Sequence, residues 1–337
     1  MIIEGLGPED RAAMAAALRR GEPVRLELRG AVPRGVRLDE IAPLCYAATA
    51  RDPTDRRVLE AFSAPAARPG SDARVTVIVP CHRGNPAGVA ALMRQDVAVR
   101  VIVLSNGPDG PERVPGAEVM RVDWEGHGRT RQRAIAAVRD PYVLFTVDDA
   151  IPLGAGFLRT LVEALEEGGW DAVTARQVPW PDADRVTAER LRRWTPAGHR
   201  VVAFPQVDNV ASLYRTETLR AAPFPDVVIA EDAWWSEGRR IGYVPHAPVL
   251  HSHPREGRGL YRRTRDIHAE LVAMGQPPAV PGLPALIAGA PGLVRPSLIG
   301  QRGEWRNQIA ELFGQWAGAR EGVKRRKAVA GKGKKKR

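Results

Sequence analysis

The sequence predicts a mixed α/β fold in which a mainly parallel β-sheet carries helices on its faces. One observation is that Val75–Pro80 (VTVIVP) is a continuous apolar, largely β-branched run, as expected for a strand buried on both faces. A second is that similar runs recur along the chain with amphipathic segments between them. The third is that 337 residues with 44% hydrophobic content suffice for one large domain with appendages or for two modest domains.

Residues 1–70 come before the sheet pattern and predict a small N-terminal α/β extension. A helix is expected near Pro8–Arg20 and a short strand at Val24–Gly30 (VRLELRG). Mixed helical segments follow, up to the linker SAPAARPGSD at residues 63–72. No residue pattern in this extension indicates chemistry, so its role is left open.

The first βαβ unit begins directly after this linker. Asn85 as N-cap and Pro86 at the first helical position predict a helix that runs through AGVAALMRQ, and the strand Val99–Ser105 follows it. The later segments alternate in the same way: AEVMRV (117–122), RTRQRAIAAV (129–138), YVLFTV (142–147), GFLRTLVEALEE (156–167) and DAVTA (171–175). Such alternation favours an open, doubly wound sheet whose ligand lies beyond the carboxyl ends of the strands.

The carboxy-terminal part of the chain differs in composition. Amphipathic segments at residues 260–275 and 306–320 predict a helical region over 257–323, which caps the sheet domain of residues 71–256. Nine Lys and Arg residues stand within the last fourteen positions, and every lysine of the chain lies there. We therefore expect a disordered, solvated basic tail over residues 324–337.

The net charge and the two cysteines limit which partners and which cellular compartment are expected. Without the nine cations of the tail, the net charge of +11 falls to about +2, so the body gives no reason to expect a nucleic-acid partner. The tail could instead contact anionic lipid at the inner face of the plasma membrane. Cys45 and Cys81 belong to no CxxC or zinc pattern, and the first residues do not form a secretory signal, so a cytoplasmic protein is expected.

Three groups of residues indicate chemistry. Asp148–Asp149 follow the strand YVLFTV, and adjacent carboxylates at a strand end are favourable when a divalent cation and phosphate oxygens meet them. Capping of a helix by one of the two acids is the alternative. Glu231–Asp232 stand at the start of a second element, and His251 closes the apolar run APVL. Each group alone is a weak signal, but all three fall in the same α/β domain.

A set of motifs over roughly residues 74–275 resembles the family 2 glycosyltransferases of the GT-A fold, and within them the rhamnosyltransferase-type branch. The motifs are VTVIVPCHRG, VIVLSNG, GHGRTRQRAI, YVLFTVDDAIP, TARQVPWPDA, DNVASLYR, the ED pair and VLHSH. The stretch GHGRTRQRAI lacks the third glycine of a GxGxxG fingerprint, which disfavours a dinucleotide-dependent dehydrogenase.

The resemblance implies a role for each acid. The last Asp of the family's DxD motif matches Asp149, which would hold the metal, and Asp148 would contact the donor. The first Asp of that motif falls on Val147, a departure that puts metal dependence in question. The ED pair implies that Asp232 is the catalytic base, with Glu231 as its neighbour. The V-x-H pattern selects His251 as a second metal ligand.

The same resemblance implies a donor-binding and an acceptor-binding set. The loops after the first two strands would cradle the nucleoside, and the helix of GHGRTRQRAI would offer cations to the diphosphate. The donor-binding residues are then Pro80, Cys81, His82, Ser105, Asn106, Arg129, Arg133 and Asp148. Trp234 and Trp235 follow the base, and one of the two indoles is expected to stack on the acceptor sugar.

The function implied is inverting transfer of a sugar, with rhamnose or another deoxyhexose expected. The donor would be a nucleoside-diphosphate sugar held with Mn²⁺ or Mg²⁺, and the acceptor a hydroxyl of a glycan or lipid-linked glycan in cell-surface polysaccharide synthesis. Two alternatives remain. A sugar-nucleotide nucleotidyltransferase is disfavoured because PCHRGNPAG is a poor version of its phosphate loop. A non-catalytic nucleotide-sugar or glycan-binding protein would explain the incomplete DxD motif.

Overall fold

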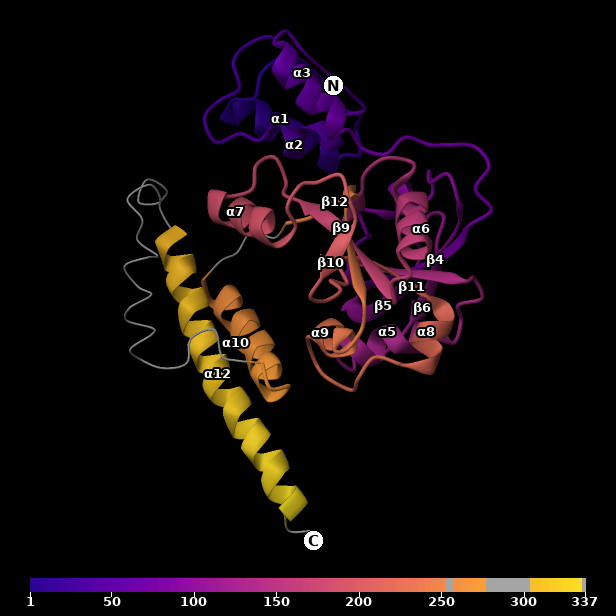
Figure 1. The fold of residues 1–337 in the computed structure, drawn as a ribbon, viewed down its shortest axis with the longest axis vertical. Helices are drawn as coiled ribbons and strands as arrows, with labels where there is room; N and C mark the ends of the chain where they lie inside the picture. Colours follow the sequence, from indigo (N-terminus) through magenta and orange to yellow (C-terminus); the bar gives the residue numbers. More distant parts are fainter. Residues whose placement is uncertain (253–256, 277–303, 335–337) are drawn as a thin grey trace. The chain divides into compact units, whose positions relative to one another are not determined.

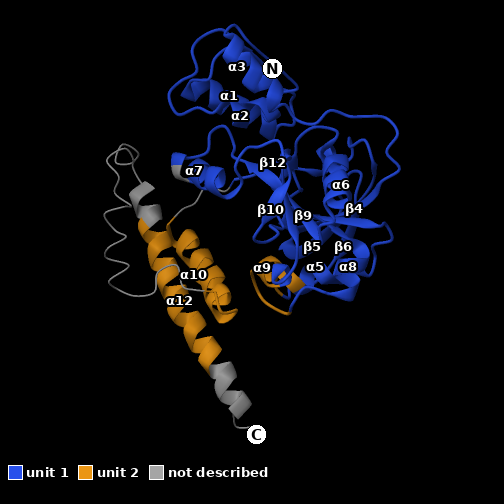
Figure 2. Ribbon diagram, in the orientation of Figure 1, with its two compact units in different colours: residues 1–125, 129–225, 235–253 blue, residues 126–128, 226–234, 254–337 orange. Residues whose placement is uncertain are grey.

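The computed structural model of the protein describes residues 1–252, 257–276 and 304–334. The chain divides into two compact units, shown in blue and orange in Figure 2. The first unit comprises Met1–Glu125, Arg129–Pro225 and Trp235–His253, and the second comprises Gly126–Gly128, Asp226–Trp234 and Pro254–Arg337.

A nine-stranded sheet forms the centre of the first unit, with the order β10-β12-β9-β11-β7-β4-β5-β6 and with β8 paired to β12 (Figure 1). Six strands run in one direction: β4 (Arg74–Arg83), β5 (Ala98–Asp109), β6 (Glu118–Arg121), β7 (Tyr142–Thr146), β9 (Ala172–Val178) and β12 (Ile241–Leu250). Three run against them: β8 (Ile151–Pro152), β10 (Val202–Phe204) and β11 (Ala211–Arg215). The predicted mixed, mainly parallel sheet is therefore confirmed.

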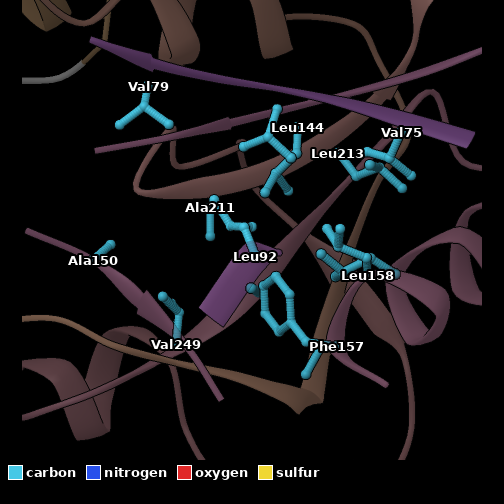
Figure 3. Packing of buried hydrophobic residues seen from close by; sticks show 14 of the residues in the cluster. Val75, Val79, Leu92, Leu144, Ala150, Phe157, Leu158, Ala211, Leu213 and Val249 are labelled. Carbon is cyan, nitrogen blue, oxygen red and sulfur yellow. The ribbon is translucent and has the colours of Figure 1, made fainter. Parts of the chain in front are cut away.

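Helices cover both faces of this sheet. Side chains along β4 point alternately to the two faces, and apolar residues occur on both. Val75 and Val77 point into a core shared with α6 (Phe157–Gly168), part of which is drawn in Figure 3. Ile78 points to the opposite face, into a core that includes Ile135 of α5 (His127–Ile135). The remaining helices of this unit are α4 (Val89–Leu92), α7 (Arg185–Trp194) and α8 (Thr216–Ala221), while α9 (Glu231–Ser236) begins in the second unit and ends in the first. The uninterrupted apolar run of β4 thus follows from burial on both faces.

The N-terminal residues form a second, smaller layer within the same compact unit. The parallel strands are β1 (Ile2–Ile3), β2 (Arg25–Leu28) and β3 (Ala47–Ala50), and the helices are α1 (Pro8–Arg19), α2 (Leu38–Ile41) and α3 (Pro53–Ala61), with a 3₁₀ turn at Ala42–Leu44. The apolar core of this layer includes Leu153, Val178 and Leu250, which follow or end strands of the main sheet. The extension therefore supports the carboxyl ends of β9 and β12.

Buried ion pairs reinforce this contact. Arg176 of β9 donates to Asp39 at 3.0 Å, and both side chains are at most one-tenth exposed. Arg192 of α7 makes two hydrogen bonds to the carboxylate of Glu40. Because a buried charge without its partner is costly, these pairs hold the N-terminal layer in one position on the sheet.

Two local predictions were wrong. The helix expected from Asn85 and Pro86 begins only at Val89, because Ala87 donates its backbone N–H to the carbonyl of Asp148 at 2.7 Å, and Ala87–Gly88 form a turn before the helix. The sheet was also expected to follow an open, doubly wound pattern. It departs from that pattern because β11 is inserted antiparallel between β7 and β9.

The second unit contains two long helices, α10 (Gly257–Ala273) and α12 (Glu304–Lys334). The expectation of a disordered tail from Lys324 is corrected for residues 324–334, which continue α12. Lys, Arg and Ala are good helix formers, and Arg325 adds ion pairs to Glu321 and Glu270. Across the described ranges, none of the helices combines the length and the apolar composition needed to cross a bilayer.

Candidate functional site

Strand pairing brings Asp149 and His251 together at the carboxyl edge of the main sheet. Asp149 comes two residues before β8, and His251 follows β12 directly. The two strands pair antiparallel, with Ile151 opposite Leu250, so the residues that flank this pair become neighbours. Nε2 of His251 lies 3.6 Å from Oδ1 of Asp149. The histidine is buried, whereas 42% of the Asp149 side chain is exposed. Solvent or a ligand therefore reaches the pair from the side of the carboxylate.

A buried amide determines which nitrogen of His251 carries hydrogen. Gln177 donates from Nε2 to Oδ2 of Asp208 at 2.6 Å, and its Oε1 lies 2.9 Å from Nδ1 of His251. A carboxylate only accepts, so the amide nitrogen must face Asp208 and the amide oxygen must face the imidazole. Nδ1 of His251 is then the donor, so that in the neutral form of the ring the lone pair of Nε2 is directed toward Asp149.

Asp208 is itself held from several sides. Its Oδ2 accepts from Nε1 of Trp194 at 3.3 Å, and its Oδ1 accepts from the backbone N–H of Val210 at 3.1 Å. Its own backbone N–H donates to Ser212 Oγ at 3.1 Å. Gln177 lies on β9 next to β12, with Gln177 opposite Val249 in the parallel register. The orientation of His251 is therefore fixed by hydrogen bonds that reach across several strands and loops.

The two facing atoms, Nε2 of His251 and Oδ1 of Asp149, could both bind one divalent cation as ligands. Two atoms that each lie about 2.1 Å from a hard cation can be up to about 4.2 Å apart, and the 3.6 Å between Nε2 and Oδ1 is within that limit. The residues described contain no group of three or more His, Cys, Asp or Glu side chains arranged to hold a metal. A cation bound here would thus need ligands beyond the described side chains, and phosphate oxygens are suitable.

The side chain of Asp148 lies beside Cys81 on the neighbouring strand β4. Burial raises the pKa of the Cys81 thiol to about 11, and the carboxylate of Asp148 beside it acts in the same direction. Cys81 is fully buried and its Sγ lies 3.5 Å from the carbonyl of Arg83, so its predicted contact with a donor is not supported. It instead shapes the end of β4 next to Asp148.

The two segments predicted as loops after the first two strands are instead parts of those strands, β4 and β5, and they lie side by side. Gly107 packs so closely on His82 that a Cβ atom would come within 2.2 Å of the His82 carbonyl oxygen. Ser105 is fully buried and accepts a hydrogen bond from Nη1 of Arg121 at 2.7 Å, so it supports the loop rather than facing a ligand. Asn106 is 7% exposed, and its Oδ1 has no hydrogen-bond partner within the part of the chain that the structure describes.

Other predicted donor contacts lie at the surface. Pro80 is half-buried and His82 exposed, both near the end of β4. Arg129 and Arg133 are exposed on α5, and Arg133 pairs with Glu125 at 2.7 Å. That hydrogen bond is the main cause of a raised pKa of Arg133. Arg133 therefore has a protein partner, which weakens its assignment to the diphosphate.

The second unit carries the predicted base. Asp232 is half-buried in the first turn of α9 and accepts from the backbone N–H of Ala233 at 2.9 Å, while Glu231 beside it is buried. Ala230, just before them, has φ 63°, a left-handed conformation that a residue with a Cβ adopts at a cost of roughly 1–2 kcal/mol. Such strain is tolerated where the surrounding structure holds a segment in one conformation, and it often marks a functional position.

The two tryptophans after the base have different environments. Trp235 is 2% exposed, packs edge-on against Tyr214 and donates from Nε1 to the carbonyl of Ala222 at 2.8 Å. It is a core residue of the first unit, so its predicted contact with an acceptor is corrected. Trp234 is half-buried, and its Nε1 has no hydrogen-bond partner among the described residues. His253, the other histidine of VLHSH, lies outside the described residues.

Gln177 and Asp208 were not predicted as site residues. Both fall within quoted motifs, Gln177 in TARQVPWPDA and Asp208 in DNVASLYR. The available signal for Gln177 was a polar side chain near the end of a buried strand, whereas Asp208 lies between β10 and β11, where no such signal is present. Their function could not be inferred locally, because it depends on the pairing of β9 with β12.

Comparisons with known proteins support the fold. A scan against known protein families gave no match, and no curated protein matches the sequence either. Among solved structures, the mannosyltransferase PcManGT from Pyrobaculum calidifontis, in complex with GDP-Man and Mn²⁺, has a TM-score of 0.52 at 17% identity, over 93% of this chain and 99% of that chain.

Two further solved structures are more distant. S. aureus TarS has a TM-score of 0.42 at 17% identity, over 59% of this chain and 40% of that chain. GalNAc-T7 with UDP, GalNAc and Mn²⁺ has a TM-score of 0.43 at 10% identity, over 70% and 53% of the two chains. This chain thus spans less than two thirds of either protein. Together with the sheet order, the likeness to PcManGT confirms the GT-A type of α/β fold predicted from the sequence.

Proposed function

We propose that this protein is a glycosyltransferase that uses a nucleoside-diphosphate sugar and transfers the sugar with inversion. The observation that carries the proposal is the pair formed by Asp149 and the oriented Nε2 of His251 at the carboxyl edge of a GT-A sheet. In α/β sheets of this kind, ligands bind beyond the carboxyl ends of the strands. The pair thus lies where the diphosphate of a donor would bind.

Asp149 and His251 would hold a divalent cation together with the donor diphosphate. A set that includes one imidazole nitrogen favours Mn²⁺ over Mg²⁺, because Mg²⁺ prefers oxygen ligands. When bound, the cation would offset the negative charge of the departing diphosphate. Val147 at the first DxD position then matters less, because His251 supplies the second protein ligand. Asn106 would offer its Oδ1, which has no partner in the described ranges, to an N–H or hydroxyl of the sugar donor.

Asp232 would act as the base toward the acceptor. Its carboxylate takes the proton of the acceptor hydroxyl as that oxygen attacks the anomeric carbon. The bond between the anomeric carbon and the diphosphate oxygen breaks, and the nucleoside diphosphate leaves with both electrons. One displacement inverts the configuration, and no covalent intermediate forms. The indole N–H of Trp234, which lies two residues from the base and has no hydrogen-bond partner among the described residues, would donate to a hydroxyl of the acceptor.

The substrate classes follow from the sequence resemblance. The rhamnosyltransferase-type motifs support a deoxyhexose donor and a glycan or lipid-linked glycan acceptor of a cell-surface polysaccharide. PcManGT is named with GDP-Man, so guanosine diphosphate sugars belong in the donor panel beside uridine and thymidine diphosphate sugars. The amide of Asn106 can pair with the N–H groups of all three bases and does not choose among them.

The proposal is tested by release of nucleoside diphosphate from this panel, with Mn²⁺ and simple glycoside acceptors. We expect turnover with one donor, and a product whose anomeric configuration, read by NMR, is opposite to that of the donor. Asp232→Asn should lower turnover by roughly 10²–10⁴-fold while donor affinity stays close to that of the wild type. Glu237→Gln, an exposed acid just beyond α9, is the matched control and should keep full turnover. Wild-type turnover in Asp232→Asn would remove Asp232 as the base.

A further inference from the structure

The helix α12 uses one of its faces to pack against α10 at close range. Gly314, Gly318 and Gly322 recur at intervals of four residues and so share a face of the helix. A Cβ atom on each would come within 2.8, 2.4 and 2.5 Å, respectively, of a backbone oxygen of α10. These oxygens belong to Tyr261, Arg265 and Ala269. The three glycines therefore allow the close contact between the two helices, and this face of α12 is occupied.

The opposite face of α12 is apolar and basic. At 3.6 residues per turn, six residues lie roughly half a turn from the glycines and follow one another at intervals of four and three. They are Ile309, Phe313, Trp316, Arg320, Val323 and Lys327, here called the apolar-basic face. Ile309, Phe313 and Val323 are 37%, 44% and 39% exposed, so α10 does not cover them. Large apolar side chains exposed along one stripe are unusual for a helix that has no further partner.

The aromatic and cationic groups of this face contact one another. The rings of Phe313 and Trp316 meet edge to face, with centroids 6.4 Å apart. The guanidinium of Arg320 lies 4.9 Å from the centroid of the Trp316 ring. The face thus presents aromatic rings flanked by positive charge, with the apolar and basic groups on one surface.

Acidic side chains are kept to the other side of the helix. Between Ile309 and Lys327 the acids are Glu311 and Glu321, and both lie roughly 120° or more around the helix from the centre of the apolar-basic face. Glu321 accepts from Arg325 at 3.3 Å, and Arg325 also pairs with Glu270 of α10. The apolar-basic face therefore carries cations without acids, and the run of Lys and Arg from residue 324 onward extends this positive charge.

We infer that the apolar-basic face of α12 docks onto an anionic lipid bilayer. Aromatic and aliphatic side chains of a helix lying in the plane of a membrane enter the boundary between headgroups and acyl chains, while Lys and Arg meet the anionic headgroups. Each such cation near an anionic surface strengthens binding by roughly fivefold. The inference goes beyond the proposed function and does not rest on it, since a bilayer would bind this face whatever reaction the first unit catalyses.

Two other occupants fit the same face less well. A nucleic acid would use the cations but would leave Ile309, Phe313 and Val323 without an apolar partner. A second copy of α12 would cover the apolar side chains but would bring Arg320 and Lys327 toward the cations of its copy, and like charges at close range are unfavourable. A bilayer with anionic headgroups satisfies both groups at once.

Co-sedimentation of the full chain with vesicles tests the inference. Vesicles of phosphatidylcholine alone would be compared with vesicles that contain about a third phosphatidylserine, at low and at physiological salt. We expect binding to the anionic vesicles, weakened by salt. The double variant Phe313→Ser/Trp316→Ser keeps every charge and should bind at least about tenfold more weakly. Lys324→Gln/Lys327→Gln should weaken binding by roughly fivefold per charge.

The matched control replaces two exposed apolar residues of the first unit. Tyr46→Ser/Met93→Ser removes side chains that are 66% and 46% exposed and should leave vesicle binding unchanged. Circular dichroism checks that each variant keeps its helix content. Binding that survives Phe313→Ser/Trp316→Ser but is lost in Lys324→Gln/Lys327→Gln would overturn the inference in favour of a basic tail acting alone. Absence of vesicle binding would also overturn it, as would RNA binding or self-association that depends on Phe313 and Trp316.

Discussion

Replacing Gln177 by Leu would remove the group that orients His251 while leaving Asp149 and His251 in place. The wild-type amide lies 2.9 Å from Nδ1 of His251 and donates to Asp208 at 2.6 Å, in a buried position. Leucine has a similar volume and no polar atoms. The variant leaves Nδ1–H of His251 without its acceptor, and the imidazole is free to turn or to change tautomer.

Two magnitudes follow from this geometry. Loss of a partner that orients a metal-bound histidine typically lowers metal affinity by about 10–100-fold. The buried polar groups left behind should lower the free energy of unfolding by about 1–3 kcal/mol, although Asp208 keeps its bond from Trp194. The assay is calorimetric titration of Mn²⁺ into the protein with a nucleoside diphosphate present, together with urea unfolding of the apoprotein.

Gln95→Leu provides a matched control for general destabilisation. Gln95 is another partly buried glutamine in the first unit, and it donates to the carbonyls of Ala91 and Gly154 and accepts from the N–H of Leu158. It contacts neither Asp149 nor His251 through these bonds. We expect Gln95→Leu to lower stability by a similar amount and to leave Mn²⁺ affinity unchanged. Equal Mn²⁺ affinity in Gln177→Leu and wild type would refute the reasoning about His251.

Two further predictions concern stability. Asp39→Ala leaves the buried guanidinium of Arg176 without its partner and should lower the free energy of unfolding, measured in urea, by about 3–5 kcal/mol. The double variant Asp39→Ala/Arg176→Met should recover much of this loss. If Asp39→Ala were as stable as the wild type, the account of how the N-terminal layer is held would be contradicted. Burial raises the pKa of Cys81 from 9.0 to about 11 and that of Cys45 from 9.0 to about 12. The folded protein then binds these protons more tightly than the unfolded chain, so stability should be full below pH 9 and fall as the pH rises toward 11, with a smaller fall in Cys45→Ala/Cys81→Ala.

The parts of the fold that follow from local pattern were predicted. The runs that became β4, β5 and β7 are apolar and β-branched because both faces of each strand are buried, and this burial is visible in sequence. The antiparallel β11 was missed as a strand, since Ala211–Arg215 is short and its place between β7 and β9 depends on distant partners. The start of α4 at Val89 was missed for a related reason, because a hydrogen bond to Asp148 holds the preceding loop.

The site was predicted residue by residue with unequal success. The proximity of Asp149 and His251 could be anticipated, because both follow strands that end at one edge of the sheet. The orientation of His251 could not, because Gln177 and Asp208 reach it only through the folded sheet. One of Trp234 and Trp235 was expected to stack on an acceptor sugar; the aromatic cluster around Tyr214 buries Trp235, so the expectation now concerns Trp234 alone. In the tail, the charge pattern indicated disorder, whereas helix propensity and ion pairs extended α12 to Lys334.

The central claim is that Asp149 and His251 bind a nucleoside diphosphate through a divalent cation. Calorimetric titration of UDP, dTDP and GDP, each with and without Mn²⁺, tests it most directly. We predict that one of the three binds only when Mn²⁺ is present, and that Asp149→Asn weakens this binding at least about tenfold. Glu167→Gln, an exposed acid on α6, should bind like the wild type. No binding by any of the three nucleotides, or equal binding in Asp149→Asn and wild type, would contradict the claim.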